Sequence, residues 1–169
     1  THAVKISLAS SRTPSASQQF FFGTAFEAND VGYLGFGASG ALSTILSFWV
    51  RASVTGTFSV SWTNDANDRS YIATYTIDAA DTWEHKTVTF DGDTSGTWTN
   101  SGTGRHSFLQ WDLGAGSNFD GTADQWQAGN LRKTSGSVDF VSGTDGDEFY
   151  ITGIMLEQGE KATPFEHIS

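Results

Sequence analysis

Apolar and polar residues alternate with a period of two through much of the middle of the chain. The alternation runs over residues 43–51, 56–62, 70–77 and 84–90, in segments rich in Val, Ile, Thr and aromatic residues. Clusters of Gly, Asn and Asp separate these segments. Because successive side chains of a strand point to opposite faces, this pattern is typical of half-buried antiparallel strands. It predicts an all-β chain.

The flanking sequence extends the list of expected strands. Further strand-like segments lie at residues 3–8, 18–26, 31–37, 105–113, 137–141 and 148–157. Two stacked antiparallel sheets are the economical packing for so many short strands, so we expect a single β-sandwich of jelly-roll type over residues 1–169, with almost no helix. Residues 114–135 show no periodicity and predict a long surface loop, the kind of segment that often carries function.

Charge narrows the range of partners. Nine basic residues against nineteen acidic ones give a net charge of −10, and the basic residues form no stripe. Such a surface repels phosphate backbones, so we expect neither nucleic-acid binding nor membrane insertion, and neutral, hydroxyl-rich partners fit better. The chain has no cysteine, which excludes disulfides and thiolate-bound metals. It opens at Thr1 without Met, so we expect a fragment, or the C-terminal part, of a larger protein.

Motifs for cofactors, metals and catalysis are incomplete. Gly35–Gly40 satisfies G-x-G-x-x-G, but a strand-like segment follows where dinucleotide binding needs a helix. Asp91–Gly96 begins like a calcium loop, yet Gly102 stands where the bidentate Glu is required. The four histidines are scattered, and no G-x-S-x-G elbow is present. We therefore predict no catalytic residue, no metal and no cofactor, and a polysaccharide-degrading enzyme is only the third alternative.

Aromatic residues are unusually abundant, at 14% of the chain. Most fit the inward positions of strands and are expected in the core, as are Phe48 and Trp62. We expect Trp83 to plug one end of the sandwich. Trp49 shares a face with Ser47 and Arg51, and this face is either the side packed on the second sheet or an open surface.

Two tryptophans lie in polar, glycine-rich sequence outside the strands, and they are the best candidates for a ligand site. Trp98 and Trp126 have Asp, Asn and Gln residues nearby. A flat ring beside amides and carboxylates is what sugar binding requires, since the ring covers the C–H side of a pyranose and the polar groups take its hydroxyls. Tyr33 and Tyr71 are expected to assist. The alternative is that both tryptophans anchor loops or pack at a subunit interface.

Several stretches resemble a jelly-roll domain that recurs in tail-fibre and other appendage proteins of tailed bacteriophages. The resemblance spans roughly residues 31–169 and is carried by residues 46–53, 55–58, 80–98, 113–117, 154–159 and 162–167. In outline the chain is also similar to carbohydrate-binding modules of secreted enzymes. The resemblance implies an extracellular virion location, a homo-oligomer, most simply a trimer, contact with other virion proteins, and non-catalytic binding of host cell-surface polysaccharide. The alternative is a purely structural virion domain without a ligand.

Overall fold

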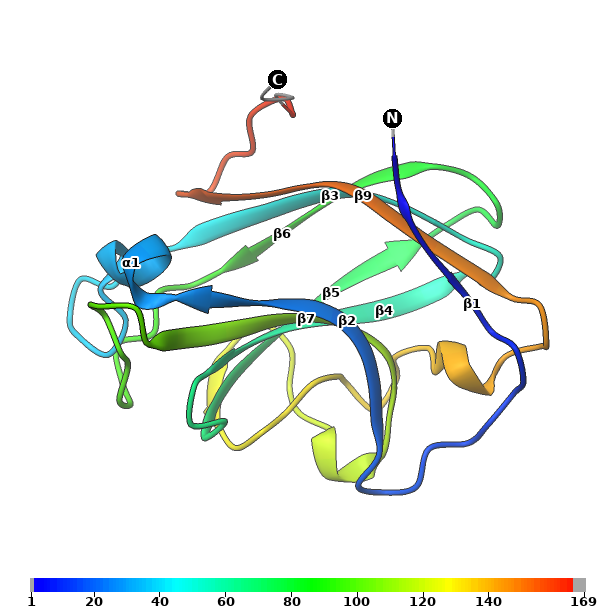
Figure 1. Ribbon diagram of the computed structural model, residues 1–169, viewed down its shortest axis with the longest axis horizontal. Helices are drawn as coiled ribbons and strands as arrows, with labels where there is room; N and C mark the ends of the chain where they lie inside the picture. Colours follow the sequence, from blue (N-terminus) through cyan, green and yellow to red (C-terminus); the bar gives the residue numbers. More distant parts are fainter. Residues whose placement is uncertain (1, 166–169) are drawn as a thin grey trace.

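Two antiparallel β-sheets lie face to face in the computed structural model, which describes residues 2–165 (Figure 1). The four-stranded sheet has the order β1-β9-β3-β6 and consists of β1 (Val4–Ser7), β3 (Thr44–Ala52), β6 (Glu84–Phe90) and β9 (Glu148–Gln158). The five-stranded sheet has the order β2-β7-β4-β5-β8 and consists of β2 (Gln19–Glu27), β4 (Gly56–Asn64), β5 (Arg69–Ile77), β7 (Arg105–Ala115) and β8 (Trp126–Ala128).

The strand order identifies the topology. If the three-residue β8 is set aside, the remaining strands form two nested sets, β1-β9-β3-β6 and β2-β7-β4-β5. The chain crosses between the sheets at most connections, and every strand pair is antiparallel. This is the double Greek-key order of a jelly roll. The predicted fold class is confirmed.

The core lies between the two sheets and is built from the inward positions of the alternating segments. Phe48 and Trp62, expected there, are fully buried, as are Phe58, Phe90 and Trp111. Trp62 and Phe90 meet edge to face across the sandwich with ring centroids 5.4 Å apart. Edge-to-face pairs of this kind contribute about 0.5–1.5 kcal/mol beyond the area they bury.

Two expected strands are absent from the described residues. Where residues 31–37 were expected to extend, the chain forms the short helix α1 (Ala28–Val31) and the 3₁₀ turn η1 (Gly32–Leu34). Val31 and Leu34 are both buried, and a spacing of three residues puts both on one side of a turn but on opposite faces of a strand. At 137–141 the chain instead leads into the 3₁₀ turn η3 (Phe140–Ser142), whose neighbours Phe140 and Val141 are both buried.

The segment from residue 116 to residue 143 is more ordered than the predicted surface loop. It contains η2 (Ser117–Phe119) and β8, which extends the five-stranded sheet beyond β5. Figure 1 shows it beneath the lower, five-stranded sheet, on the side away from the four-stranded sheet. Arg132 and Lys133 in this segment are buried. The lack of periodicity in the sequence of this segment therefore reflects an irregular but packed structure rather than an open surface loop.

No helix in the described part of the chain combines the length and the apolar character needed to cross a membrane. The last residues of the segment that carries the phage resemblance, Glu166 and His167, lie outside the described residues.

Candidate functional site

Phe21 is the exposed member of three consecutive phenylalanines on β2. Its neighbours Phe20 and Phe22 point between the sheets and pack against the core. Phe21 pairs with Asp112 of β7 and points to the outer face of the five-stranded sheet, where 45% of it is exposed. Because a strand alternates its faces, a run of three aromatic residues must present the middle ring on the opposite side. A lone exposed ring beside a carboxylate is therefore fixed at this position.

A small polar cavity lies beside Phe21 on the outer face of the same sheet, and its side chains leave no room for a water molecule. Three strands and the 116–143 segment supply its lining, which consists of Gln19, Phe21, Ser61, Gln110, Asp112 and Arg132. Ser61 of β4 and Gln110 of β7 are paired residues in the sheet, so both side chains point the same way. The cavity thus follows directly from strand register.

Asp112 is the chemically unusual residue of this cavity. It is 3% exposed, and neither carboxylate oxygen has a hydrogen-bond partner among the described residues. Burial raises its pKa from 3.8 to about 7, since a buried carboxylate lacks the water that stabilises its charge. The nearby Lys133 ammonium lowers the pKa of Asp112 and so opposes this upward shift. The Gly114 N–H also lowers it, although its contact with the carboxylate falls short of hydrogen-bond geometry.

Other acceptors in the cavity are also unpaired within the described chain. The Ser61 Oγ and the Gln110 Oε1 are buried and have no partner there. Buried polar atoms without partners are uncommon and costly, each by about 1–3 kcal/mol. Together with Asp112 they form a group of unpaired acceptors that is closed to solvent in this structure.

Arg132 closes one side of the cavity. Its guanidinium donates to the Gln19 Oε1 at 3.2 Å, to the Thr63 Oγ1 at 3.0 Å and to the Asn67 Oδ1 at 3.0 Å. These bonds tie the 116–143 segment to β2, to β4 and to the turn after β4. Burial lowers the pKa of Arg132 to about 10, and the charge of Asp112 partly offsets this. The side chain stays charged at neutral pH.

Open grooves surround the exposed ring. A groove of about 540 Å³ runs along the edge of the sandwich beside Phe21 and is lined by Ile6, Gln19, Phe20, Phe21, Phe22, Leu113 and Val141. On its other side, a shallower hollow of about 240 Å³ lies over Gly23, Ala25 and Phe108. A Cβ at Gly23 would lie 2.5 Å from the Leu109 carbonyl oxygen, so glycine is required there. We call Gln19, Phe21, Ser61, Gln110, Asp112 and Arg132 the Phe21 surface.

The structure brings Trp98 and Trp126 together, but as packing residues. Their rings meet edge to face with centroids 5.3 Å apart, and both also contact the buried Phe36. The Trp98 Nε1 donates to the Ser95 carbonyl oxygen at 3.1 Å, and the Trp126 Nε1 to the Asp91 carbonyl oxygen at 2.6 Å. Both rings are only partly exposed. This geometry favours the anchoring alternative, while their contact with a ligand stays a prediction.

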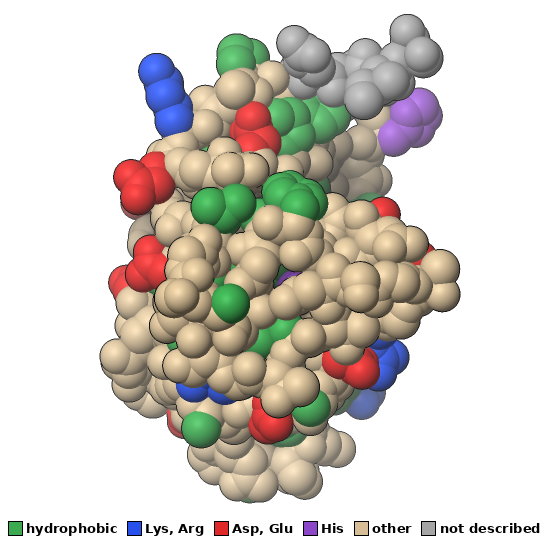
Figure 2. Space-filling view, turned by 90° about the vertical axis from the view of Figure 1, so that its left-hand side faces the viewer, with side chains coloured by type: hydrophobic (Ala, Val, Ile, Leu, Met, Phe, Trp, Pro, Cys, Tyr) green, Lys and Arg blue, Asp and Glu red, His purple; other side chains and the backbone are tan. Residues whose placement is uncertain are grey.

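The two predicted tyrosines behave differently. Tyr71 is 3% exposed and packs edge to face against Phe90 and Trp126, and this packing disfavours the predicted contact of its ring with a ligand. It lies on an inward position of β5. Tyr33, in η1, is 62% exposed. Figure 2 shows the end of the sandwich that carries α1 and η1, where hydrophobic side chains surface only in separate small areas.

Trp49 and Trp83 both reach the surface of the sandwich. Trp49 points to the outer face of the four-stranded sheet and is 41% exposed, which settles the choice between core and open surface. Trp83 is 40% exposed and contacts Tyr150 rather than plugging the sandwich. The prediction for Trp83 was wrong because the turn before β6 places its ring outside the sheet.

Several polar side chains outside the Phe21 surface are paired with one another within the fold. Asp93, in the segment that resembles a calcium loop, accepts two bonds from the Arg69 guanidinium, at 2.8 Å and 2.6 Å. Within residues 2–165, no group of three His, Asp or Glu side chains could hold a metal ion. The His106 Nδ1 lies 2.8 Å from the Ser107 Oγ, but both residues are fully buried, so this pair is closed to a substrate.

Comparisons with known proteins add little to this geometry. No protein-family model matches the sequence, and no curated protein matches it. Among solved structures, the chain is similar to one described as "CBM4 structure and function", with a TM-score of 0.48 and 12% sequence identity over 93% of this chain and 71% of that chain. The fold assignment above therefore stands on strand order alone.

Proposed function

We propose that the domain binds a neutral glycan without catalysis through the Phe21 surface. The observation that carries this proposal is the exposed Phe21 ring, which lines a groove of about 540 Å³ and lies beside the unpaired acceptors around Asp112. A sugar offers both complements, since its C–H face stacks on an aromatic ring and its hydroxyls donate to acceptors. The expected carbohydrate binding is thereby moved from Trp98 and Trp126 to Phe21.

The two spaces beside Phe21 differ in what they can hold. The polar cavity next to Asp112 leaves no room for a water molecule, whereas the 540 Å³ groove falls in the range of about 300–1,000 Å³ typical of ligand sites. A sugar ring lying against Phe21 therefore fits the groove, and its hydroxyls reach Asp112 only if the cavity opens. The net charge of −10 disfavours sulfated or carboxylated chains.

A pair of substitutions tests this site. Phe21→Ala should weaken binding about tenfold or more by removing the stacking face, and Asp112→Asn should do the same by replacing an acceptor with a donor at equal size. A glycan array identifies the ligand, and NMR titration with that oligosaccharide measures the affinity, which we expect between about millimolar and micromolar. Tyr33→Ala, another exposed aromatic, is the matched control. Unchanged affinity in both variants would overturn the proposal.

We further propose that this binding serves a bacteriophage appendage that attaches to host cell-surface polysaccharide. The support is the sequence resemblance of residues 46–53 and 80–98 to such domains. Weak sites become useful when several copies act together, which fits the homotrimer that we predict. Light scattering at micromolar concentration should give about three times the monomer mass, and a monomeric mass would contradict this assembly.

A purely structural virion role is the second candidate, and one observation favours it. Trp98 and Trp126 contribute their indole N–H groups to loop carbonyls and their rings to the packing around Phe36. The residues first suspected of binding therefore stabilise loops. A glycan array on which no glycan binds would favour the structural role.

A further inference from the structure

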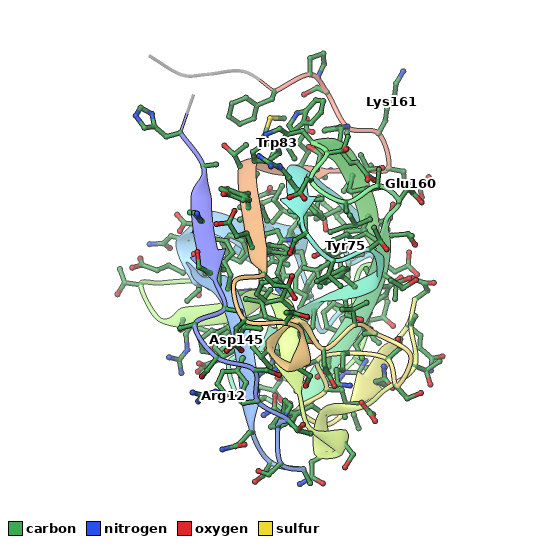
Figure 3. The ribbon with its side chains drawn as sticks, turned by 90° about the vertical axis from the view of Figure 1, so that its right-hand side faces the viewer. Arg12, Tyr75, Trp83, Asp145, Glu160 and Lys161 are labelled. Carbon is green, nitrogen blue, oxygen red and sulfur yellow. The ribbon has the colours of Figure 1, made fainter. Side chains whose placement is uncertain are left out.

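The outer face of the four-stranded sheet carries a second concave aromatic surface, on the side of the sandwich opposite the Phe21 surface. A groove of about 360 Å³ is lined by His2, Ala3, Trp49, Trp83 and Thr152. Trp49 comes from β3, Thr152 from β9 and Trp83 from the turn before β6. Figure 3 shows Trp83 near the end of the molecule where, in Figure 1, the two chain ends lie. We call these five residues the Trp49 groove.

The local structure holds both indoles in place while leaving them exposed. Gly153 of β9 has a φ of +61°, and a Cβ there would lie 3.2 Å from the Trp49 Cδ1. The absent side chain gives Trp49 room to lie close to the strand, with the His85 ring at a centroid distance of 5.1 Å on its other side. Trp83 contacts Tyr150 at 6.1 Å.

The charges that border the groove are already matched. Arg51 pairs with Asp81 at 3.4 Å, and Lys5 pairs with Glu148. Both cations also lie over the ring of Tyr150, at 5.3 Å and 5.5 Å from its centroid. The rim thus offers polar groups on both sides without a net charge, which suits a neutral ligand better than a charged one.

The exposed aromatic area is by itself too small for a stable protein interface. Trp49, Trp83 and the neighbouring Phe165 are each between two fifths and half exposed, which amounts to about 250 Å² together if an aromatic side chain presents about 200 Å². A stable interface needs about 800 Å² from each partner. The groove volume instead falls within the range of small-ligand sites.

We propose that the Trp49 groove is a second site for a neutral carbohydrate, in which a pyranose ring lies against Trp49 or Trp83 and a sugar hydroxyl donates to the Thr152 Oγ1, which itself donates to the His2 carbonyl oxygen at 2.7 Å. The Phe21 surface and the Trp49 groove lie on opposite sheets, so one domain could hold two chains of a polysaccharide at once. Two-site engagement raises the effective affinity without any new contact.

The test uses the methyl glycosides of glucose, galactose, mannose and N-acetylglucosamine at up to tens of millimolar, where weak sugar sites become occupied. Saturation-transfer NMR detects binding, and the indole N–H signals of ¹⁵N-labelled protein report the site. At least one glycoside should shift the Trp49 and Trp83 signals. Trp49→Ala and Trp83→Ala should each weaken the binding that these indole signals report about tenfold, whereas Asp30→Asn, at an exposed carboxylate of α1, should leave it unchanged.

A second variant guards against an effect on folding. Ala3 lies in an exposed segment before β1, so Ala3→Phe should fill the groove without altering either tryptophan, and it should also abolish the indole shifts. The proposal is overturned if no glycoside shifts these signals. It is also overturned if Trp49→Ala only lowers a concentration-dependent mass in light scattering, which would identify a contact between copies. Because the indole signals of Trp49 and Trp83 report only on this groove, the two sites can fail separately.

Discussion

Replacing Trp98 or Trp126 by alanine should lower the free energy of unfolding by about 3 kcal/mol each. Truncating a packed aromatic side chain typically costs about 3–5 kcal/mol, and partial exposure places these rings at the lower end. Each change also leaves a loop carbonyl, of Ser95 or Asp91, without its donor. Trp98 also lies against Gly37, where a Cβ would be 3.0 Å from its Cδ1. Losing the ring would therefore loosen the glycine-rich turn as well.

Urea unfolding at constant pH measures this effect, with Tyr33→Ala as the control. Tyr33 is exposed at the same end of the sandwich, so its removal should change stability by no more than about 0.5 kcal/mol. Because the two tryptophans touch, the double variant should lose less than the sum of the single losses. If both single variants keep full stability and lose glycan binding, these rings are ligand contacts and the anchoring interpretation is wrong.

Asp112→Asn should stabilise the domain above pH 7 and have little effect near pH 4. The pKa of Asp112 is about 7 in the folded chain against 3.8 for an unperturbed carboxyl, so the folded state binds the proton more tightly. Ionising this group therefore costs stability progressively as the pH rises from about 4 to about 7. The full difference corresponds to at most about 4 kcal/mol, at 1.36 kcal/mol per pH unit. Asn keeps the shape and removes the charge.

His106 produces the opposite slope in the same pH range, so the wild-type profile alone would be ambiguous. Its burial lowers the pKa from 6.5 to about 4. The unfolded state then binds the proton more tightly, and stability falls as the pH drops from about 6.5 to about 4. The difference between Asp112→Asn and the wild type cancels this contribution and isolates Asp112.

The measurement is urea unfolding of the wild type and Asp112→Asn at several pH values between 4 and 8. This series covers the pKa values of both Asp112 and His106. The gain in stability should grow steadily with pH and level off above about 7. Asp30→Asn, at an exposed carboxylate of α1, should show no such trend. A gain in stability that is independent of pH would mean that ionisation of Asp112 does not destabilise the fold.

The fold was predictable because apolar and polar residues alternate along its strands. Residues 84–90 carry the clearest signal, since Val88 and Phe90 are buried and the residues beside them are more exposed, whereas in β3 the alternate polar positions are mostly buried as well. The signal failed at residues 31–37 and 137–141, where neighbouring apolar residues are buried together in 3₁₀ turns. Short segments of this kind contain too few residues for a period of two to be told from a period of three.

The candidate site was less predictable, for a physical reason. Trp98 and Trp126 stood out as large residues in polar sequence, but glycine-rich loops can fold back and bury a ring. Phe21 was hidden in a run of apolar residues, although the alternation of β2 requires it to face away from Phe20 and Phe22. Asp112 belongs to an alternating strand as well. Its isolation from partners depends on the 116–143 segment, which no periodicity describes.

The position of β2 at the edge of the five-stranded sheet links binding to solubility. One side of this nine-residue strand pairs with β7, and its other side meets no strand among the described residues. No charged side chain occurs between Gln19 and Phe26, whereas proteins commonly protect such edges with lysines, prolines or short strands. Of the other edge strands, β1 and β8 are only four and three residues long, and the seven-residue β6 carries the charged side chains of Glu84 and Lys86. The strand that presents Phe21 is thus also the one most open to aggregation, and the two properties cannot be improved independently there.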